Sequence, residues 1–199
     1  MTISEHALSN WAGEENYAGE DGPLLSRCLA GEEAAYTALY NRYAPYIYRL
    51  TYGLLQHRED AEEVLQDSFA YAFRKLARYD PSRASFKTWL YQIAVSRCRN
   101  KRRRKWLPTV PLGQLQVHDR KTPTPAEALA LTAQQKIIWQ ALRQLSPKLR
   151  ETAVLRYYEG LTYREIGQIL DIPTKTAESR MRLAHKALKQ LLHDEFSEV

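Results

Sequence analysis

The most concentrated chemistry in this sequence is cationic. The run "RCRNKRRRK", residues 97–105, holds seven arginine or lysine side chains and no carboxylate. A row of such groups neutralises the phosphates of a polyanionic backbone without reading its sequence. The 199-residue chain carries a net charge of +6, whereas residues 1–22 contain five acids and no lysine or arginine. This uneven charge indicates a polyanionic partner for residues 97–105.

Catalytic chemistry has little support in the sequence. The five histidines are scattered along the chain: His6, His57, His118, His185 and His193. There is no HExxH motif, no phosphate-cradling glycine loop and no cluster with metal-ligand spacing. The two cysteines, Cys28 and Cys98, lie far apart, which argues against a zinc knuckle or a disulfide framework and is typical of a reducing cytoplasm. We therefore expect no catalytic residue, no metal and no cofactor.

A second binding feature is the stretch "LTYREIGQILDIPTKTAESRMRLAHKAL", residues 161–188. It predicts a short helix capped by Thr162, a break at Asp171 and Pro173, and a longer helix capped by Thr174. The longer helix has an apolar face and an opposite polar, basic face: Ala177, Met181, Ala184, Leu188 and Leu191 against Lys175, Ser179, Arg182 and Lys186. This is the layout of a DNA-reading helix-turn-helix, although an ordinary helical hairpin has the same pattern.

An acidic helix face is predicted within "REDAEEVLQDSFAYAFRKLARY", residues 58–79. Its apolar face comprises Ala61, Val64, Leu65, Ser68 and Ala72, and its polar face comprises Glu63, Gln66, Asp67 and Ala70. Together with Asp60, the polar side chains could dock on a basic or polar partner helix. A solvated acidic face is the alternative.

The apolar spacing predicts an all-α protein with two small helical domains, at 23–106 and 126–195, after a flexible acidic leader over residues 1–22. Pro45 is expected to punctuate the helical pattern of the first domain. Residues 107–125 contain four prolines and a glycine, which is linker composition. No apolar run reaches membrane-spanning length, and the N-terminus lacks the basic start and apolar core of a signal peptide. We therefore expect a cytoplasmic protein without membrane insertion.

The order of these pieces resembles the extracytoplasmic-function group of sigma factors, which direct bacterial RNA polymerase to promoters. "GEEAAYTALYNRYAPYIYRL" is similar to the family's opening helices, and "DAEEVLQDSFAYAF" is similar to its core-polymerase-binding helix. "SFKTWLYQIAVSRCRNKRRR" resembles the helix at the upstream edge of promoter opening. "LSPKLRETAVLRYYEGLTYREIGQILDIPTKTAESRMRLAHKAL" resembles the helix-turn-helix domain. The resemblance covers nearly the whole chain after the leader.

This resemblance implies a non-enzymatic subunit that binds core RNA polymerase, recognises −10 and −35 promoter elements and supports promoter opening. The implied partners are promoter DNA, an anti-sigma factor, and the clamp coiled coil of the largest polymerase subunit together with the flap. The candidate core-binding residues are Asp60, Glu63, Gln66 and Asp67. The candidates for the −10 element and backbone are Ser82, Arg83, Ser85, Lys87, Tyr91, Arg99, Arg102 and Arg103. The candidates for the −35 element are Arg156, Lys175, Thr176, Glu178, Ser179, Arg182 and Lys186, with Leu183 at a further reading position.

Two aromatic residues near the −10 candidates have two interpretations each. In the family, the loop that matches "DPSRAS", residues 80–85, captures a flipped base, and flipping needs a pocket and nearby cations. Tyr91 could stack on an exposed base or could be a rim aromatic. Trp89 could be a melting wedge, but its spacing from Phe86 and Ile93 favours the core.

The chain departs from the family pattern in the helix-turn-helix. Glu178 stands where a basic residue is frequent, and phosphate repels a carboxylate unless the carboxylate accepts from a cytosine amino group. We expect Glu178 either to lie opposite a cytosine or to turn towards Lys175 or Arg182. Asp171 stands where glycine is usual, at a position that favours a left-handed backbone. Gly167 replaces a common alanine, which could allow closer helix packing.

The proline-rich stretch is long enough for a two-element promoter. Residues 107–125 span at most roughly 63–68 Å when extended. The resemblance implies elements about 16 or 17 base pairs apart, roughly 54–58 Å along the DNA. Two rival functions are a plain transcriptional regulator, which would leave the acidic helix unexplained, and a helical adaptor without DNA binding, which the arginine-rich run opposes.

Overall fold

The computed structural model describes residues 21–106 and 133–197, and every regular element in these ranges is a helix. The N-terminal helices are α2 (Asp21–Leu29), α3 (Glu33–Leu55), α4 (Arg58–Arg74), the 3-10 helix η2 (Leu76–Arg78) and α5 (Phe86–Trp106). The C-terminal helices are α6 (Ala133–Gln144), α7 (Pro147–Tyr157), α8 (Tyr163–Leu170) and α9 (Thr174–Ser197). The all-α prediction is confirmed, and the expected linker at 107–125 lies outside the described residues. No described helix has the length and apolar character needed to cross a membrane.

Helix α2 begins slightly before the position that the sequence indicated for the first domain. Asp21 and Gly22, which we assigned to the leader, begin α2. The Asp21 carboxylate is buried, and it accepts hydrogen bonds from Tyr43 Oη at 2.6 Å and Arg42 Nη1 at 3.0 Å. These bonds tie the start of α2 to the middle of α3. The rest of the expected leader, residues 1–20, lies outside the described ranges.

The N-terminal helices pack around a shared aromatic and aliphatic core. The predicted faces of α4 are confirmed, since Ala61, Val64, Leu65, Ser68 and Ala72 are buried and Glu63, Gln66, Asp67 and Ala70 are exposed. Phe86 contacts Tyr43, with ring centroids 5.5 Å apart, and Trp89 packs against Phe86 and Tyr79. Trp89 therefore belongs to the core side of α5, as its spacing favoured. Pro45 lies inside α3 on an exposed position and does not end the helix.

The C-terminal helices form the predicted helix-turn-helix. Thr162 caps α8 in a reciprocal arrangement, in which its Oγ1 accepts from the backbone N–H of Glu165 while the Glu165 carboxylate accepts from the backbone N–H of Thr162. The turn contains Asp171 and Pro173, and α9 begins at Thr174, one residue earlier than the sequence indicated. The predicted apolar face of α9 is buried or half-buried at Ala177, Met181, Ala184, Leu188 and Leu191.

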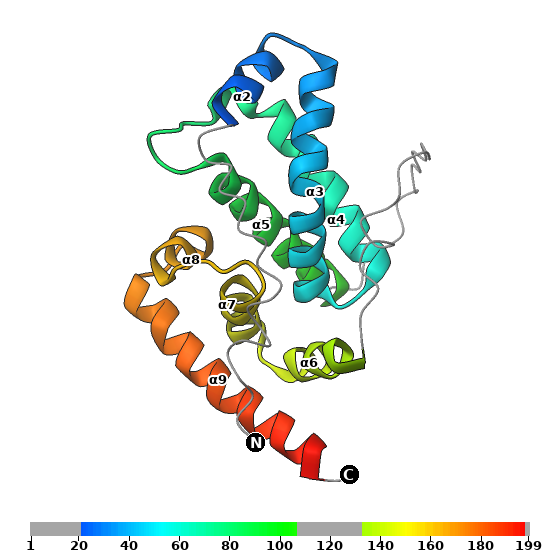
Figure 1. The fold of residues 1–199 in the computed structure, drawn as a ribbon, viewed down its shortest axis with the longest axis vertical. Coiled ribbons are helices and arrows are strands. Elements are labelled where there is room, and N and C mark those ends of the chain that lie inside the picture. Colours follow the sequence, from blue (N-terminus) through cyan, green and yellow to red (C-terminus); the bar gives the residue numbers. More distant parts are fainter. Residues whose placement is uncertain (1–20, 107–132, 198–199) are drawn as a thin grey trace.

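The two groups of helices pack against one another. Helix α3 contacts α7, and α5 contacts α8, as Figure 1 shows. The buried apolar residues of both groups form one continuous cluster. The side chains that each group presents to solvent are therefore decided partly by the other group.

We expect Asp171→Gly to stabilise the protein. Asp171 ends α8 in the left-handed conformation, with φ 56° and ψ 56°, and its backbone N–H bonds to the Gly167 carbonyl. An L-residue pays about 1–2 kcal/mol for this conformation, whereas glycine does not. Allowing for the greater unfolded-state entropy of glycine, the free energy of unfolding should rise by about 0.5–1 kcal/mol. Urea unfolding followed by circular dichroism measures the change.

Asp171→Asn is the matched control, because asparagine also tolerates the left-handed region but carries no charge. An increase seen equally with Asp171→Asn and Asp171→Gly would assign the effect to the lost carboxylate and contradict the backbone explanation.

Candidate functional site

The outward face of α9 is polar and cationic. The exposed residues on it are Lys175, Glu178, Ser179, Arg182 and Lys186, and Thr176 is half-buried. Leu183 is also exposed, at 54%. Because the opposite face of α9 packs on α7 and α8, this face has a fixed orientation. The structure therefore brings the predicted −35 residues of α9 together on one solvent-facing surface.

Glu178 makes no ion pair with Lys175 or Arg182 in the described part of the chain. One of the two arrangements expected for this carboxylate, turning towards a neighbouring cation, is therefore not formed in this structure. The carboxylate is exposed beside the cations rather than neutralised by them.

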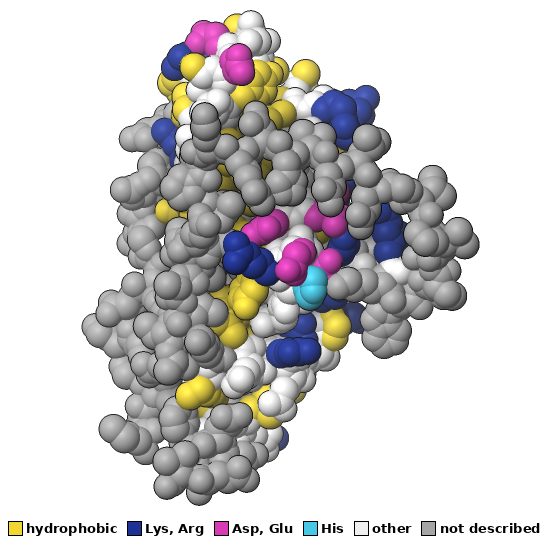
Figure 2. All heavy atoms as spheres, turned by 90° about the vertical axis from the view of Figure 1, so that its right-hand side faces the viewer, with side chains coloured by type: hydrophobic (Ala, Val, Ile, Leu, Met, Phe, Trp, Pro, Cys, Tyr) yellow, Lys and Arg dark blue, Asp and Glu magenta, His cyan; other side chains and the backbone are white. Residues whose placement is uncertain are grey.

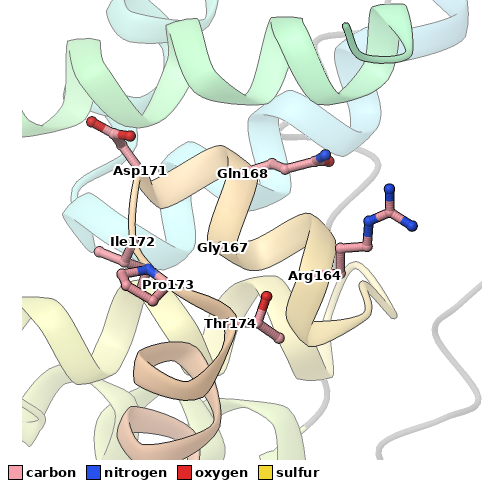
Figure 3. A pocket seen from close by; sticks show the side chains of 7 residues that line it. All are labelled: Arg164, Gly167, Gln168, Asp171, Ile172, Pro173 and Thr174. Carbon is pink, nitrogen blue, oxygen red and sulfur yellow. The ribbon is translucent and has the colours of Figure 1, made fainter.

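The turn between α8 and α9 is tight enough to require Gly167. A Cβ at this position would lie 2.8 Å from the backbone oxygen of Ile172, which is shorter than real side chains allow. The expectation that Gly167 permits close packing is confirmed. A shallow hollow of about 350 Å³ lies over the same turn, with Arg164 and Asp171 at opposite ends of it (Figure 3).

Arg156, another −35 candidate, holds the loop before α8. Its Nη1 donates to the Leu161 carbonyl at 3.0 Å, and its guanidinium lies over the Tyr163 ring at 5.1 Å from the centroid. The side chain is half-buried at the end of α7. These contacts position Arg156 and leave it less accessible than the cations of α9.

Two of the predicted phosphate-binding arginines are engaged within the protein. Arg99 Nη2 lies 2.8 Å from Glu151 Oε2, and Arg102 Nη2 lies 2.5 Å from Glu151 Oε1. The hydrogen bond to Glu151 raises the pKa of the Arg99 guanidinium. Arg103 is exposed, and its guanidinium donates to Asn100 Oδ1 at 3.3 Å. Over residues 97–104, the structure therefore does not present one uninterrupted exposed row.

Tyr91 is neither an exposed stacking residue nor a rim aromatic, so both interpretations need correction. It is fully buried, and its hydroxyl donates to Glu159, 68 residues away in the chain. Burial, and then the charge of Glu159, raise the pKa of Tyr91 well above its usual value. The Lys87 ammonium lies over the rings of Tyr91 and Tyr46, at 5.6 and 5.5 Å. In this arrangement Tyr91 is unavailable to a base.

The loop at residues 80–85 is held in shape by its own polar side chains. Asp80 Oδ1 accepts from the backbone N–H and the hydroxyl of Ser82, at 2.9 and 2.7 Å. These hydrogen bonds lower the pKa of Asp80. Ser85 Oγ accepts from the Thr88 backbone N–H at 3.1 Å at the start of α5, and Arg83 is exposed. Ser82 and Arg83 are therefore accessible, while Ser85 also serves the helix.

The acidic face of α4 is exposed at three of its four candidate residues, Glu63, Gln66 and Asp67. The prediction for Asp60 needs correction, because this residue is buried. The Lys101 ammonium lies 3.5 Å from Asp60 Oδ1 and 2.5 Å from Glu63 Oε2. Figure 2 shows acidic side chains gathered beside a histidine and several basic side chains on this side of the molecule. The His57 Nδ1 atom lies 3.5 Å from the Asp60 carboxylate.

Glu151 and Glu159 are not among the residues predicted from the sequence, yet they contact the cationic and aromatic candidates of α5. A signal was present for Glu151, since Glu151, Leu155 and Tyr158 lie at helical spacing on an otherwise apolar stripe. A carboxylate in such a stripe is almost never buried without a partner. Its partner could not be identified from α7 alone. Among the described residues, no group of histidine, cysteine and acidic side chains could hold a metal ion.

Two family models match this chain, Sigma-70 region 2 over residues 39–107 and Sigma-70 region 4 over residues 135–188. The chain is 30% identical over 179 residues to the ECF RNA polymerase sigma factor SigW of Bacillus subtilis, covering 85% of this chain and 95% of that protein. It is 27% identical over 182 residues to the RNA polymerase sigma-H factor of Pseudomonas aeruginosa, covering 87% and 94%.

Two solved structures share the fold. CnrH in complex with the cytosolic domain of CnrY has a TM-score of 0.65 at 23% identity, covering 86% of this chain and 96% of that one. The sigma factor RpoE in complex with the anti-sigma factor NepR from Bartonella quintana has a TM-score of 0.61 at 20% identity, covering 79% and 96%. The two family matches and the sequence relatives agree with the exposed face of α9. This chain therefore belongs to the extracytoplasmic-function group of sigma-70 family sigma factors, which are non-enzymatic subunits that direct RNA polymerase to promoters.

Proposed function

We propose that the chain contacts promoter DNA through two surfaces and core polymerase through a third. The exposed face of α9 reads the −35 element, α5 and the loop at residues 80–85 bind the −10 region, and α4 binds core polymerase. The observation that carries this proposal is the solvent-facing row of Ser179, Arg182 and Lys186 on a helix whose opposite face is buried. Such a helix can enter a major groove without unfolding any of its packing.

The α4 surface suits a basic or polar helix of the polymerase. Glu63, Gln66 and Asp67 project from a rigid helix whose other face is buried in the core. Charged groups on such a surface contribute mainly to the association rate and to the choice of partner. The family resemblance supports the clamp coiled coil of the largest subunit as that partner, with the flap as a further contact of the C-terminal helices.

The −10 surface combines the accessible loop residues with the cations of α5. Ser82 and Arg83 are exposed on the loop, and Arg103 and Arg104 are exposed on α5. A flipped base needs a pocket and nearby cations, and the phosphates on either side of it need the basic helix. This division of roles supports promoter opening by a protein that performs no covalent chemistry.

We also propose an anti-sigma protein as a regulator of this chain. The fold it shares with RpoE of Bartonella quintana supports this proposal, because that sigma factor is solved in complex with the anti-sigma factor NepR. A regulator of this kind should compete with core polymerase. Pull-down with tagged chain, in the presence and absence of excess core polymerase, tests for such competition.

Run-off transcription with core RNA polymerase and genomic fragments tests the proposed function. Core polymerase with the chain should start transcripts that core alone does not start, from templates that carry two elements. A chain that binds DNA but does not join core polymerase would instead be a plain regulator. If it joins no core polymerase and starts no transcript on any fragment, the proposal is wrong.

Glu178→Ala is expected to change the −35 preference. The exposed carboxylate makes no ion pair with Lys175 or Arg182, so it is available to accept from a cytosine amino group in the major groove. Its removal should lower discrimination at one base pair by roughly 5- to 150-fold, because one base contact contributes about 1–3 kcal/mol. Selection from a randomised −35 library measures this change. An unchanged preference would refute the cytosine contact.

A further inference from the structure

We infer that Leu183 selects a thymine in the −35 element by contacting the C5-methyl group of that base. This inference rests on the proposed function, in which the exposed face of α9 enters the major groove, and it names one base that this face prefers. It is carried by the exposure of Leu183, by the charge of its surroundings, and by its position on α9 relative to Glu178.

Leu183 is an apolar side chain on the polar side of α9. It is 54% exposed, although Met181, Ala184 and Leu188 of the same helix are buried. Among the residues whose side chains the structure describes, Leu29 of α2 is the other large hydrophobic residue that is exposed, at 58%. A single exposed leucine needs no explanation on an ordinary surface. On a face that enters a DNA groove, however, Leu183 must meet some group of that groove.

The surroundings of Leu183 favour a polyanion as the partner that covers it. Ser179 lies one turn before Leu183, Lys186 lies one turn after it, and Arg182 precedes it directly, all three exposed. An apolar protein surface placed over Leu183 would also desolvate the two cations, which is unfavourable unless each is paired. DNA provides phosphates for the cations and base edges for the leucine. Charge complementarity therefore favours DNA over an apolar protein surface.

Thymine is the base that offers an apolar group in the major groove. The other three bases present hydrogen-bond donors and acceptors there, whereas thymine adds its C5-methyl group. A leucine side chain has no hydrogen-bonding group, so it cannot read donors or acceptors. It can bury a methyl group, and this contact removes apolar surface of both partners from water. Leu183 therefore favours thymine over cytosine, which has no methyl group at C5.

The position of Leu183 on α9 separates its base pair from the one proposed for Glu178. The two residues are five positions apart, which corresponds to about 7.5 Å along the helix and about 140° around it. Consecutive base pairs are about 3.4 Å apart. For a helix that lies along the groove, the two side chains therefore reach base pairs about two steps apart. The preferred −35 element should contain a cytosine and a thymine at this separation, on either strand.

Replacing thymine with deoxyuridine tests the contact by removing one methyl group from the DNA. The probe is the promoter duplex that the holoenzyme selects from a −35 library, with each thymine of the element replaced in turn on both strands. At one position, the replacement should weaken binding about fourfold, the effect of one buried methyl group. At the same position, 5-methylcytosine should bind about fourfold more tightly than cytosine. Fluorescence anisotropy of labelled duplex measures each affinity.

Leu183→Ala tests the protein side of the same contact. It should bind the thymine duplex at least about fourfold more weakly than wild type, and it should bind the thymine and deoxyuridine duplexes equally well. Leu183→Met keeps an apolar side chain of similar volume, so its preference for thymine should stay within about twofold of the wild-type preference. Both variants should fold, because the side chain is exposed and both replacements are good helix formers.

Leu29→Ala is the matched control, because it removes an equally exposed leucine from α2, which lies at the opposite end of the molecule from α9 (Figure 1). This variant should distinguish thymine from deoxyuridine as wild type does. The inference is overturned if Leu183→Ala keeps the full preference for thymine over deoxyuridine. It is also overturned if Leu183→Ala weakens binding to core polymerase without DNA and wild type prefers thymine at no position, because Leu183 would then contact protein.

Failure of the thymine contact and failure of the proposed function give different results. If the chain forms no holoenzyme, or the holoenzyme selects no −35 element, the proposed function is wrong. If the holoenzyme selects a −35 element and starts transcripts from it, yet binds deoxyuridine as tightly as thymine at every position, the proposed function stands and the contact by Leu183 is refuted.

Discussion

Replacing Glu63 and Asp67 together with lysine is expected to lower the affinity of this chain for core RNA polymerase by about 30-fold or more. Both carboxylates are exposed on α4, and the change turns the acidic surface that we propose for docking into a basic one. Like charges across an interface cost several kcal/mol, so about 2 kcal/mol is a cautious expectation for two reversals. The fold should survive, because the buried face of α4 is untouched. Native gel shift and fluorescence anisotropy with labelled chain measure the binding.

Glu32→Lys with Glu33→Lys is the matched control for this double reversal. The pair has the same change in net charge and also lies on exposed positions, at the start of α3. If the control weakens binding as much as Glu63→Lys with Asp67→Lys, the effect is one of net charge and the α4 face is not the docking surface. Binding to random DNA duplex should be unchanged or slightly tighter for both pairs, which separates loss of polymerase binding from unfolding.

Arg182→Ala should lower promoter-specific binding of the holoenzyme by roughly 5- to 150-fold. Arg182 is exposed on the outward face of α9 and makes no ion pair within the described ranges. An arginine in this position can donate two hydrogen bonds to one guanine, a contact that contributes about 1–3 kcal/mol of discrimination. Quantitative binding to a −35 library measures both the loss of affinity and the position at which preference relaxes.

Lys186→Ala provides the contrast that identifies the role of Arg182. Lys186 lies one turn further along the same exposed face and is expected to contact phosphate. Its removal should weaken binding to all sequences alike and reduce the slope of log affinity against log salt by about 0.9. Arg182→Ala should instead act on one base pair. A uniform loss with Arg182→Ala, equal for every −35 sequence, would make Arg182 a phosphate contact and remove it from sequence recognition.

Local pattern was sufficient for the helices and for the direction in which most side chains point. The two faces of α4, the Thr162 cap and the buried and exposed faces of α9 follow from helical spacing and capping chemistry, which depend on neighbours within a turn or two. The left-handed Asp171 and the need for Gly167 in the turn were also foreseeable, because backbone sterics act within a few residues. The family resemblance came from the order of these same local pieces.

The sequence by itself thus determined an all-α chain with an exposed acidic face on one helix, a basic helix, and a helix-turn-helix whose second helix has a polar, cationic outer face. Only the tertiary structure decided which of those charges are available. Tyr91 is buried, and its hydroxyl contacts Glu159, which lies 68 residues away in the chain. Asp60 contacts Lys101, 41 residues away. Arg99 and Arg102 contact Glu151 across 52 and 49 residues. No periodicity in one helix encodes such partners, because burial and pairing depend on which helices pack together, and packing is a property of the whole fold.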